Sequence, residues 1–262
     1  MGARLYQVLL APLLAHDSTS PQTLWIDLDP SLAMVPVAAL SSPSGAWLGD
    51  STQVAVLPAW WSLDPGAAFR QPGIGRGSRM VLVNGFDRGY GGQSETTELT
   101  TLLPHATVID GPSATKDAVL RGLATADVFH FSGHATAAAG VVFASAPGAP
   151  QSLSPDALDG VHLPHCRLAV LAACNTTSAD PDQAEELPDL RNALLLSGAQ
   201  TVVASNWDVD DRSTRSLMLA FYKQLASGLS PTQSLQSAQQ TVRSTGGWQH
   251  PYYWAAFEVF TN

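Results

Sequence analysis

The 262-residue sequence predicts an α/β fold in three layers, with helices covering both faces of a mainly parallel β-sheet. Strand-like and helix-like segments alternate along the chain, which is typical of folds built around a parallel sheet. Three strand-like segments, "DVFHFSG", "LAVLAAC" and "TVVAS", are apolar almost throughout. Such strands are expected where helices cover both faces of the sheet.

Short apolar runs bounded by proline and glycine predict strands in the first 110 residues. The opening run "LYQVLLAPL" (5–13) resembles a weak signal peptide, but it holds a proline and lacks a convincing cleavage site. We therefore expect it to be a first strand. "MVPVAALSSPSG" (34–45) predicts a short helix or turn, and "SETTELTTLLP" (94–104) predicts a helix. Further strands are expected at 23–29, 53–61, 79–85 and 106–110.

The rest of the chain continues the alternation. Residues 113–126 repeat apolar side chains at helical spacing, with Ser113 or Thr115 as the cap. Residues 187–198 are helical and stop at Gly198, a typical C-terminal cap. Amphipathic helices are expected at 211–228 and 230–245, and strands at 126–135, 141–146, 167–174, 200–207 and 252–260. Candidate loops are 41–52, 64–78, 85–93, 135–155 and the acidic, proline-marked 177–189, which we expect to be mobile.

Composition excludes several classes of function. The net charge is −9 and the chain has no basic stripe, which argues against direct nucleic-acid binding. No run of Lys and Arg suggests an anionic membrane surface, and no segment approaches the ~20 apolar residues of a spanning helix. The two cysteines, Cys166 and Cys174, do not make a disulfide framework. We expect a cytoplasmic protein.

Cys174 and His134 are the candidate catalytic residues. Ligands of an open parallel sheet bind beyond the carboxyl ends of the strands, and each of these residues ends a predicted strand. A thiolate attacks a carbonyl, an imidazole moves the proton, and backbone N–H groups of Cys174, Gly133 or Ala135 stabilise the oxyanion. The alternative is that Cys174 is a buried apolar residue, as most free cysteines are.

The other motifs do not predict a metal site, a nucleotide site or a serine hydrolase. His130 points the same way as His134 but lies deeper, so we expect a core histidine with its hydrogen bonds satisfied. Strand geometry separates the two by ~13 Å, and no HExxH motif is present, so no metal site is predicted. The glycine-rich "NGFDRGYGGQS" (84–94) matches no nucleotide-binding motif, and no GxSxG elbow occurs. We expect no cofactor.

The stretch "SNWDVDD" places Asp208, Asp210 and Asp211 after the strand that follows the Cys174 strand. One interpretation is a helix N-terminus, where carboxylates meet the positive end of the helix dipole. The other is a pocket whose carboxylate accepts a basic side chain. Both interpretations stay open, and each can hold for a different aspartate.

Several motifs in order resemble the CHAT domain, a family related to caspases and separases. They are "LWIDLDPSLAMVPVAAL", "ATVIDGPSATKDAVLRGLATAD", "DVFHFSGHA", "LAVLAACNTT", the region from "LLLSGAQTVVASNWDVDD" through the two amphipathic helices, and "HPYYWAAFEVF". The resemblance covers roughly residues 5–262. It implies a caspase-like three-layer sandwich in one peptidase domain, 1–262, with an N-terminal half (1–110) and a catalytic half (111–262).

The resemblance also implies an activity. The family's histidine falls on His134 and its cysteine on Cys174, as in a cysteine endopeptidase that cleaves proteins or peptides. Related separases select a basic residue before the scissile bond through an acidic pocket, a role that would fall to Asp208 or Asp211. "AACNT" replaces the caspase pattern QAC[RQG]G, so aspartate specificity is not supported.

The resemblance further implies partners and a setting. CHAT domains usually follow TPR repeats or sensor modules, and relatives act in bacterial antiviral defence, where a partner or ligand switches the protease on. A rival interpretation is a catalytically silent CHAT scaffold that binds partners through its acidic loop and helical faces. The intact pair of His134 and Cys174 argues against this rival.

Overall fold

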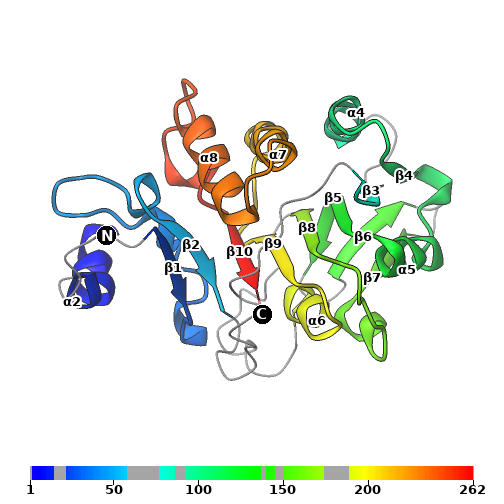
Figure 1. Cartoon of the computed structure of the whole chain (residues 1–262), viewed down its shortest axis with the longest axis horizontal. Helices are drawn as coiled ribbons and strands as arrows, with labels where there is room; N and C mark the ends of the chain where they lie inside the picture. The colour runs from blue at the N-terminus through cyan, green and yellow to red at the C-terminus, as the bar shows by residue number, and fades with distance from the viewer. Residues whose placement is uncertain are drawn as a thin grey trace.

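The computed structural model describes residues 2–14, 22–57, 77–85, 92–136, 140–144, 150–173 and 189–261. Within them ten strands form one mixed sheet, with the order β1-β2-β10-β9-β8-β5-β3-β4 and a β6–β7 hairpin attached to β5 (Figure 1). The strands are β1 (Thr23–Ile26), β2 (Gln53–Val56), β3 (Met80–Asn84), β4 (Thr107–Asp110), β5 (Val128–Thr136), β6 (Gly140–Ala144), β7 (Pro150–Leu153), β8 (Leu168–Ala173), β9 (Thr201–Ser205) and β10 (Phe257–Thr261).

The strand directions divide the sheet into two parts. Strands β9, β8, β5, β3 and β4 all run parallel to one another. Strand β10 runs antiparallel to β9, while β1 and β2 are parallel to β10. Most neighbouring pairs are therefore parallel, which confirms the predicted α/β class.

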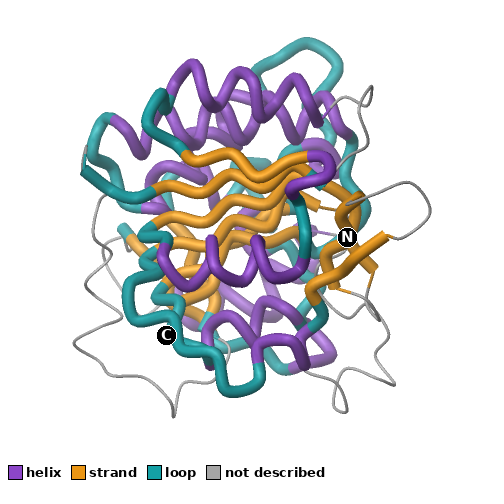
Figure 2. The backbone as a smooth tube through the Cα atoms, turned by 90° about the vertical axis from the view of Figure 1, so that its right-hand side faces the viewer, coloured by secondary structure: helices purple, strands orange, loops and turns teal. Residues whose placement is uncertain are grey.

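Helices cover both faces of this sheet, so the three layers predicted from the sequence are present (Figure 2). One face carries α4 (Gly92–Leu102), α7 (Asp211–Ala226) and α8 (Pro231–Arg243), which share a core with β3, β5, β8, β9 and β10. The other carries α5 (Lys116–Thr125) and α6 (Leu190–Leu196), which contribute to a second core. Strands β8 and β9 lie between the two cores and are buried on both faces.

Helix boundaries follow the predicted caps. Thr115, not Ser113, caps α5, and its hydroxyl accepts a hydrogen bond from the N–H of Ala118 at 3.2 Å. Helix α6 ends before Gly198, whose φ of 113° is a left-handed conformation that favours glycine.

Three predicted elements are corrected by the structure. Residues 5–13 are helical, not a strand, within α1 (Gly2–Leu5), a π-helical turn (Tyr6–Leu10) and α2 (Ala11–Leu14). Their leucines recur at helical spacing and contact a small separate core. The predicted loop 135–155 contains strand β7, and the last strand starts at Phe257 because 251–253 form a 3₁₀ turn.

Candidate active site

The carboxyl ends of β5, β8 and β9 meet at one edge of the sheet, as the sequence predicts for parallel strands. Pairing of β5 with β8 continues to Gly133 and Ala173, which lie opposite each other. His134 is the next residue of β5. Cys174 is the next residue in the sequence after Ala173, and it lies outside the described residues.

His134 is exposed, and its backbone pairs with a neighbouring strand. Strand β5 runs past the main sheet, and there it pairs antiparallel with β6, with His134 opposite Val142 and Ala135 opposite Val141. The β6–β7 hairpin thus supports the segment that carries the imidazole. The side chain is open to solvent.

Gly133 is required by packing. A Cβ atom at this position would lie 2.7 Å from the ring of Phe131, and one at Gly85 would lie 2.6 Å from the same ring. The backbone N–H of Gly85 also donates to the carbonyl of Ser132 at 2.8 Å. The ends of β3 and β5 therefore approach closely over Phe131, which leaves no room for a side chain beside His134.

The three aspartates that follow β9 have different environments. Asp210 caps α7, where its carboxylate accepts a hydrogen bond from the N–H of Ser213 at 2.9 Å. Asp211 lies in the first turn of α7 and is exposed, as is Asp208 in the preceding segment. The helix-terminus interpretation accounts for Asp210. Asp208 and Asp211 remain open to solvent at the candidate edge.

Of the acidic segment 177–189, the structure describes only Asp189. Asp189 caps α6 through the N–H of Asn192 and forms an ion pair with Arg191 at 2.6 Å. The rest of the segment lies outside the described residues.

Two buried polar residues near this edge were not predicted from the sequence. Asn206, directly after β9, donates its amide to the carboxylate of Glu258 at 2.6 Å, and both side chains are buried. Glu258 also accepts the N–H of Val37 at 3.2 Å. Burial raises the pKa of Glu258 to about 7, against the opposing effects of Asn206, Val37 and the charge of Arg191.

Ser205, the last residue of β9, is the third polar residue that was missed. Its side chain is fully buried, and its hydroxyl donates to the carbonyl oxygen of Ala173 at 2.5 Å. This bond joins the end of β9 to the residue that precedes Cys174. The only signal for it in the sequence is a serine that closes an apolar strand.

His130 is the core histidine that its position predicts. Its imidazole is 1% exposed and lies between the hydroxyl of Tyr222 at 3.1 Å and the carboxylate of Glu95 at 3.0 Å. Burial raises the pKa of Tyr222 well above its usual value, and the nearby Glu95 charge adds to this. The three residues connect β5 to α7 and α4.

Cys166 is the other cysteine of the chain. It is a free, buried thiol whose pKa is raised to about 12, mainly by burial. Such a thiol stays protonated near neutral pH and reacts slowly with electrophiles. Cys166 is therefore a control within the same chain for any labelling of Cys174.

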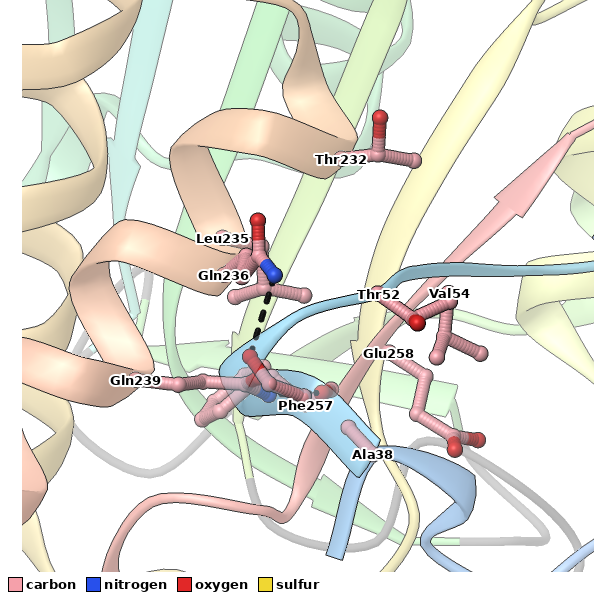
Figure 3. A pocket seen from close by; sticks show the side chains of 10 residues that line it. Ala38, Thr52, Val54, Thr232, Leu235, Gln236, Gln239, Phe257 and Glu258 are labelled. Atoms are coloured by element: carbon pink, nitrogen blue, oxygen red, sulfur yellow. Dashed lines mark hydrogen bonds between the residues drawn. The ribbon is translucent and has the colours of Figure 1, made fainter. Parts of the chain in front are cut away.

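A small cavity lies where α8 meets β2 and β10 (Figure 3). Its volume is about 20 Å³, enough for a single water molecule. Polar side chains line it, including Thr52, Gln239 and Glu258, but neither His134 nor the exposed aspartates do. The cavity is too small for a substrate side chain.

Two further features are absent from the described residues. These residues hold no group of three or more His, Cys, Asp and Glu side chains arranged to bind a metal ion. None of their helices has the length and apolar character needed to cross a membrane.

Comparison with known proteins gives consistent matches. The profile of the CHAT domain matches residues 1–262. The chain is 26% identical to "Tetratricopeptide repeat protein 28" of Mus musculus and 25% to that of Homo sapiens, over 97% of this chain in each case. It spans only 13% of the length of these relatives.

Among solved structures, a Saccharomyces cerevisiae separase–securin complex matches with a TM-score of 0.66 and 14% identity. The match covers 91% of this chain and 15% of that one. The complex of Porphyromonas gingivalis RgpB pro- and mature domains also has a TM-score of 0.66, with 10% identity over 99% of this chain and 69% of that chain. At these identities the likeness shows the fold.

Proposed function

Since the chain belongs to the CHAT domain family, whose profile matches residues 1–262, we propose that it is a cysteine endopeptidase. In this proposal Cys174 is the nucleophile and His134 is the general acid and base. The fold shared with separase and RgpB supports a caspase-like peptidase architecture. We propose a single peptidase domain, 1–262, made of the halves 1–110 and 111–262.

The observation that carries the proposal is the pairing of Gly133 with Ala173. His134 and Cys174 each follow one member of this pair in the sequence. Adjacent strands lie about 4.8 Å apart, so a thiol and an imidazole that start from such positions are within reach of each other.

The proposed reaction has two steps. The Cys174 thiolate attacks the scissile carbonyl carbon, the C–N bond breaks, and the His134 imidazolium gives its proton to the departing amine. This leaves a thioester on Cys174. A water molecule then gives a proton to His134 and attacks the thioester, which releases the carboxylic acid and restores the thiolate–imidazolium pair.

Two further features complete the proposed site. Backbone N–H groups of Cys174 and of Gly133 or Ala135 stabilise the oxyanion of each tetrahedral intermediate. The exposed carboxylate of Asp208 or Asp211 accepts a basic side chain at the position before the scissile bond, called P1.

We also propose that a protein partner regulates the peptidase in the cytoplasm. The chain matches 13% of a tetratricopeptide repeat protein, and separase was solved together with securin. A TPR-type or sensor partner is consistent with both. The curated relatives are mammalian, so a bacterial source and a role in antiviral defence rest on the sequence resemblance alone.

The test is cleavage of a fluorogenic peptide library varied at P1, with wild type, Cys174→Ala and Cys166→Ala compared side by side. We expect turnover after Arg or Lys in wild type and Cys166→Ala, none in Cys174→Ala, and little in His134→Ala. Turnover that survives Cys174→Ala would contradict the proposal.

Labelling separates a latent peptidase from a silent scaffold. A peptidyl electrophile with basic P1 should modify Cys174 and spare Cys166, whose pKa of about 12 keeps it unreactive. Slow labelling that does not distinguish the two cysteines, together with no turnover, would favour the scaffold.

A further inference from the structure

The carboxylate of Glu258 on β10 is shared by two hydrogen-bond donors. Its Oε1 accepts the N–H of Val37 at 3.2 Å, and its Oε2 accepts the side-chain amide of Asn206 at 2.6 Å. Val37 belongs to the N-terminal region, residues 2–57, while Asn206 directly follows β9. All three residues are buried, so both bonds are shielded from water.

On the β9 side, the bond to Glu258 orients the side chain of Asn206. The amide oxygen of Asn206 is buried and has no hydrogen-bond partner among the described residues. Asn206 begins the segment 206–210, and Asp210 holds the other end of this segment as the cap of α7. The exposed Asp208 lies between these two anchors.

On the other side, the donor is part of a small N-terminal core. Val37 begins the 3₁₀ turn Val37–Ala39 and packs in this core with Leu10, Leu40 and Leu48. A rearrangement of the core therefore moves the N–H that Glu258 accepts.

Two bonds on different oxygens fix the plane of one carboxyl group. The last torsion of a glutamate side chain has a broad range, so the plane turns readily once one of these bonds is lost. Loss of the Val37 bond then lets Oε2 move away from Asn206. The amide of Asn206 is left buried without its partner, which is unfavourable, so the segment 206–210 opens more often.

We propose that Glu258 is a coupling residue, through which the N-terminal region controls the segment 206–210 that carries Asp208. In the closed state the carboxylate bonds to both Val37 and Asn206, and in the open state the N-terminal region has moved and both bonds are lost. Coupling between two sites is reciprocal, so a ligand that binds the segment in its closed state also stabilises the closed N-terminal region. The consequence for peptide cleavage rests on the proposed peptidase function, but the coupling itself does not.

The first set of variants perturbs the N-terminal core from a distance. Leu10→Ala weakens this core and keeps both partners of Glu258. Leu123→Ala makes the same change at a buried leucine of α5, in a different core, and is the matched control. Glu258→Leu removes both bonds and replaces the buried carboxyl group with an apolar side chain of similar size.

The second set acts on the donor itself. Val37→Pro removes the N–H, and the backbone suits a proline because residue 37 begins a 3₁₀ turn and Pro36 before it is extended. Val37→Ala keeps the N–H and shortens the side chain, so it is the control for lost packing.

The measurement is hydrogen exchange of the backbone N–H of Asn206, which donates to the carbonyl of Ala256 at 2.9 Å, followed by NMR. We expect Leu10→Ala to speed this exchange about tenfold and Leu123→Ala to leave it unchanged. In Glu258→Leu the exchange should already be fast. Adding Leu10→Ala to this variant should change it less than about twofold while still speeding exchange in β2, and this non-additivity is the signature of coupling.

Two results of the first set would overturn the inference. One is that Leu10→Ala speeds exchange in β2 but not at Asn206, and the other is that it speeds exchange at Asn206 equally with and without Glu258. If Leu10→Ala does not fold or leaves β2 unchanged, the second set decides. Val37→Pro should speed exchange at Asn206 more than Val37→Ala does, and an equal or smaller effect would overturn the inference.

The exchange experiment needs no enzymatic turnover. Absence of Cys174-dependent turnover in wild type contradicts the proposed function and leaves the exchange result as the test of coupling. The failure of the inference and the failure of the proposed function are therefore distinguishable.

Discussion

Buried ionisable residues link parts of the chain that are far apart in sequence. Glu258 on β10 connects Asn206 at the candidate edge with Val37 in the N-terminal region. His130 connects Glu95 and Tyr222 in the same way on the face covered by α4 and α7. Each is buried between two apolar neighbours in its strand, where an unpaired charge would be strongly unfavourable.

Glu258 predicts a dependence of stability on pH. Its pKa rises from its ordinary value near 4.5 to about 7 in the folded protein, so between these values the folded state keeps a proton that the unfolded chain has released. Stability from this group is therefore fully present below about pH 4.5 and falls as pH rises to about 7. Over this range the free energy of unfolding falls by on the order of 3 kcal/mol.

Urea unfolding at pH 5 and pH 8 measures this loss. Glu258→Gln should be the more stable protein at pH 8 and should show a smaller difference between the two pH values than wild type. Glu98→Gln, which removes a half-exposed partner of Arg215, is the control and should keep the wild-type difference. Identical pH dependence in wild type and Glu258→Gln would contradict the assignment.

His130 predicts a large loss of stability on truncation. His130→Ala leaves a cavity and removes the partner of the buried Glu95 carboxylate, so we expect the free energy of unfolding to fall by about 3–5 kcal/mol. Tyr222→Phe removes one hydroxyl and should lower it by about 1–2 kcal/mol. Urea unfolding at pH 7 measures both, and a loss below 1 kcal/mol for His130→Ala would contradict the structural role.

At the scale of elements, the alternation of strands and helices was largely predictable because apolar runs and caps are local signals. The helix at 2–14 was missed because "LYQVLLAPL" is a short apolar run, for which strand and helix are hard to distinguish. Strand β7 was missed because it pairs only with β6 and has little apolar character.

The candidate site was predictable in part for the same reason. His134 is a chemically distinctive residue at a strand end, and this local position was enough to select it. Ser205 and Glu258 act through partners 32 and 221 residues away, so nothing in their own sequence neighbourhood indicates a role. The catalytic roles of His134 and Cys174 stay predictions, and the described part of β8 stops at Ala173.

The start of α7 predicts that its aspartates have separable roles. Asp210→Ala removes the helix cap and should lower the free energy of unfolding by about 1 kcal/mol without changing the P1 preference. Asp208→Asn or Asp211→Asn should change stability little and weaken the preference for basic P1. Unfolding and the peptide library measure both effects, and a P1 change confined to Asp210→Ala would contradict the assignment.

At the scale of the whole molecule, strand pairing joins the N-terminal region to the main sheet over a short stretch only, beside side-chain contacts from α8 such as the ion pair of Arg243 with Asp50. Strands β1 and β2 pair with each other along their length, but β2 reaches β10 only where Val56 lies opposite Phe260. The region also has a small core of its own, formed by Leu10, Val37, Leu40 and Leu48.

We expect residues 2–57 to open before the rest of the protein. In hydrogen exchange at low urea, amides of β1 and β2 should exchange through a subglobal opening, while those of β5, β8 and β9 exchange only on global unfolding. Strands β3 and β4 lie on the other side of the sheet and should follow the second group. If the amides of β2 and β8 were equally protected from hydrogen exchange, this order of opening would be contradicted.

The central place of β10 has a consequence for synthesis on the ribosome. This strand follows β2 by about 200 residues, yet it lies between β2 and β9 and supplies Glu258, while Ala256 just before it supplies the carbonyl that holds Asn206. At typical translation speeds, roughly 10–40 s pass between the two strands. Strand β9 is made about 50 residues before β10, so for roughly the last 3–10 s of this interval β9 has an open edge and the nascent chain lacks the support for the end of β9. If the chain is the proposed peptidase, a newly made molecule would thus stay inactive until β10 has joined the sheet.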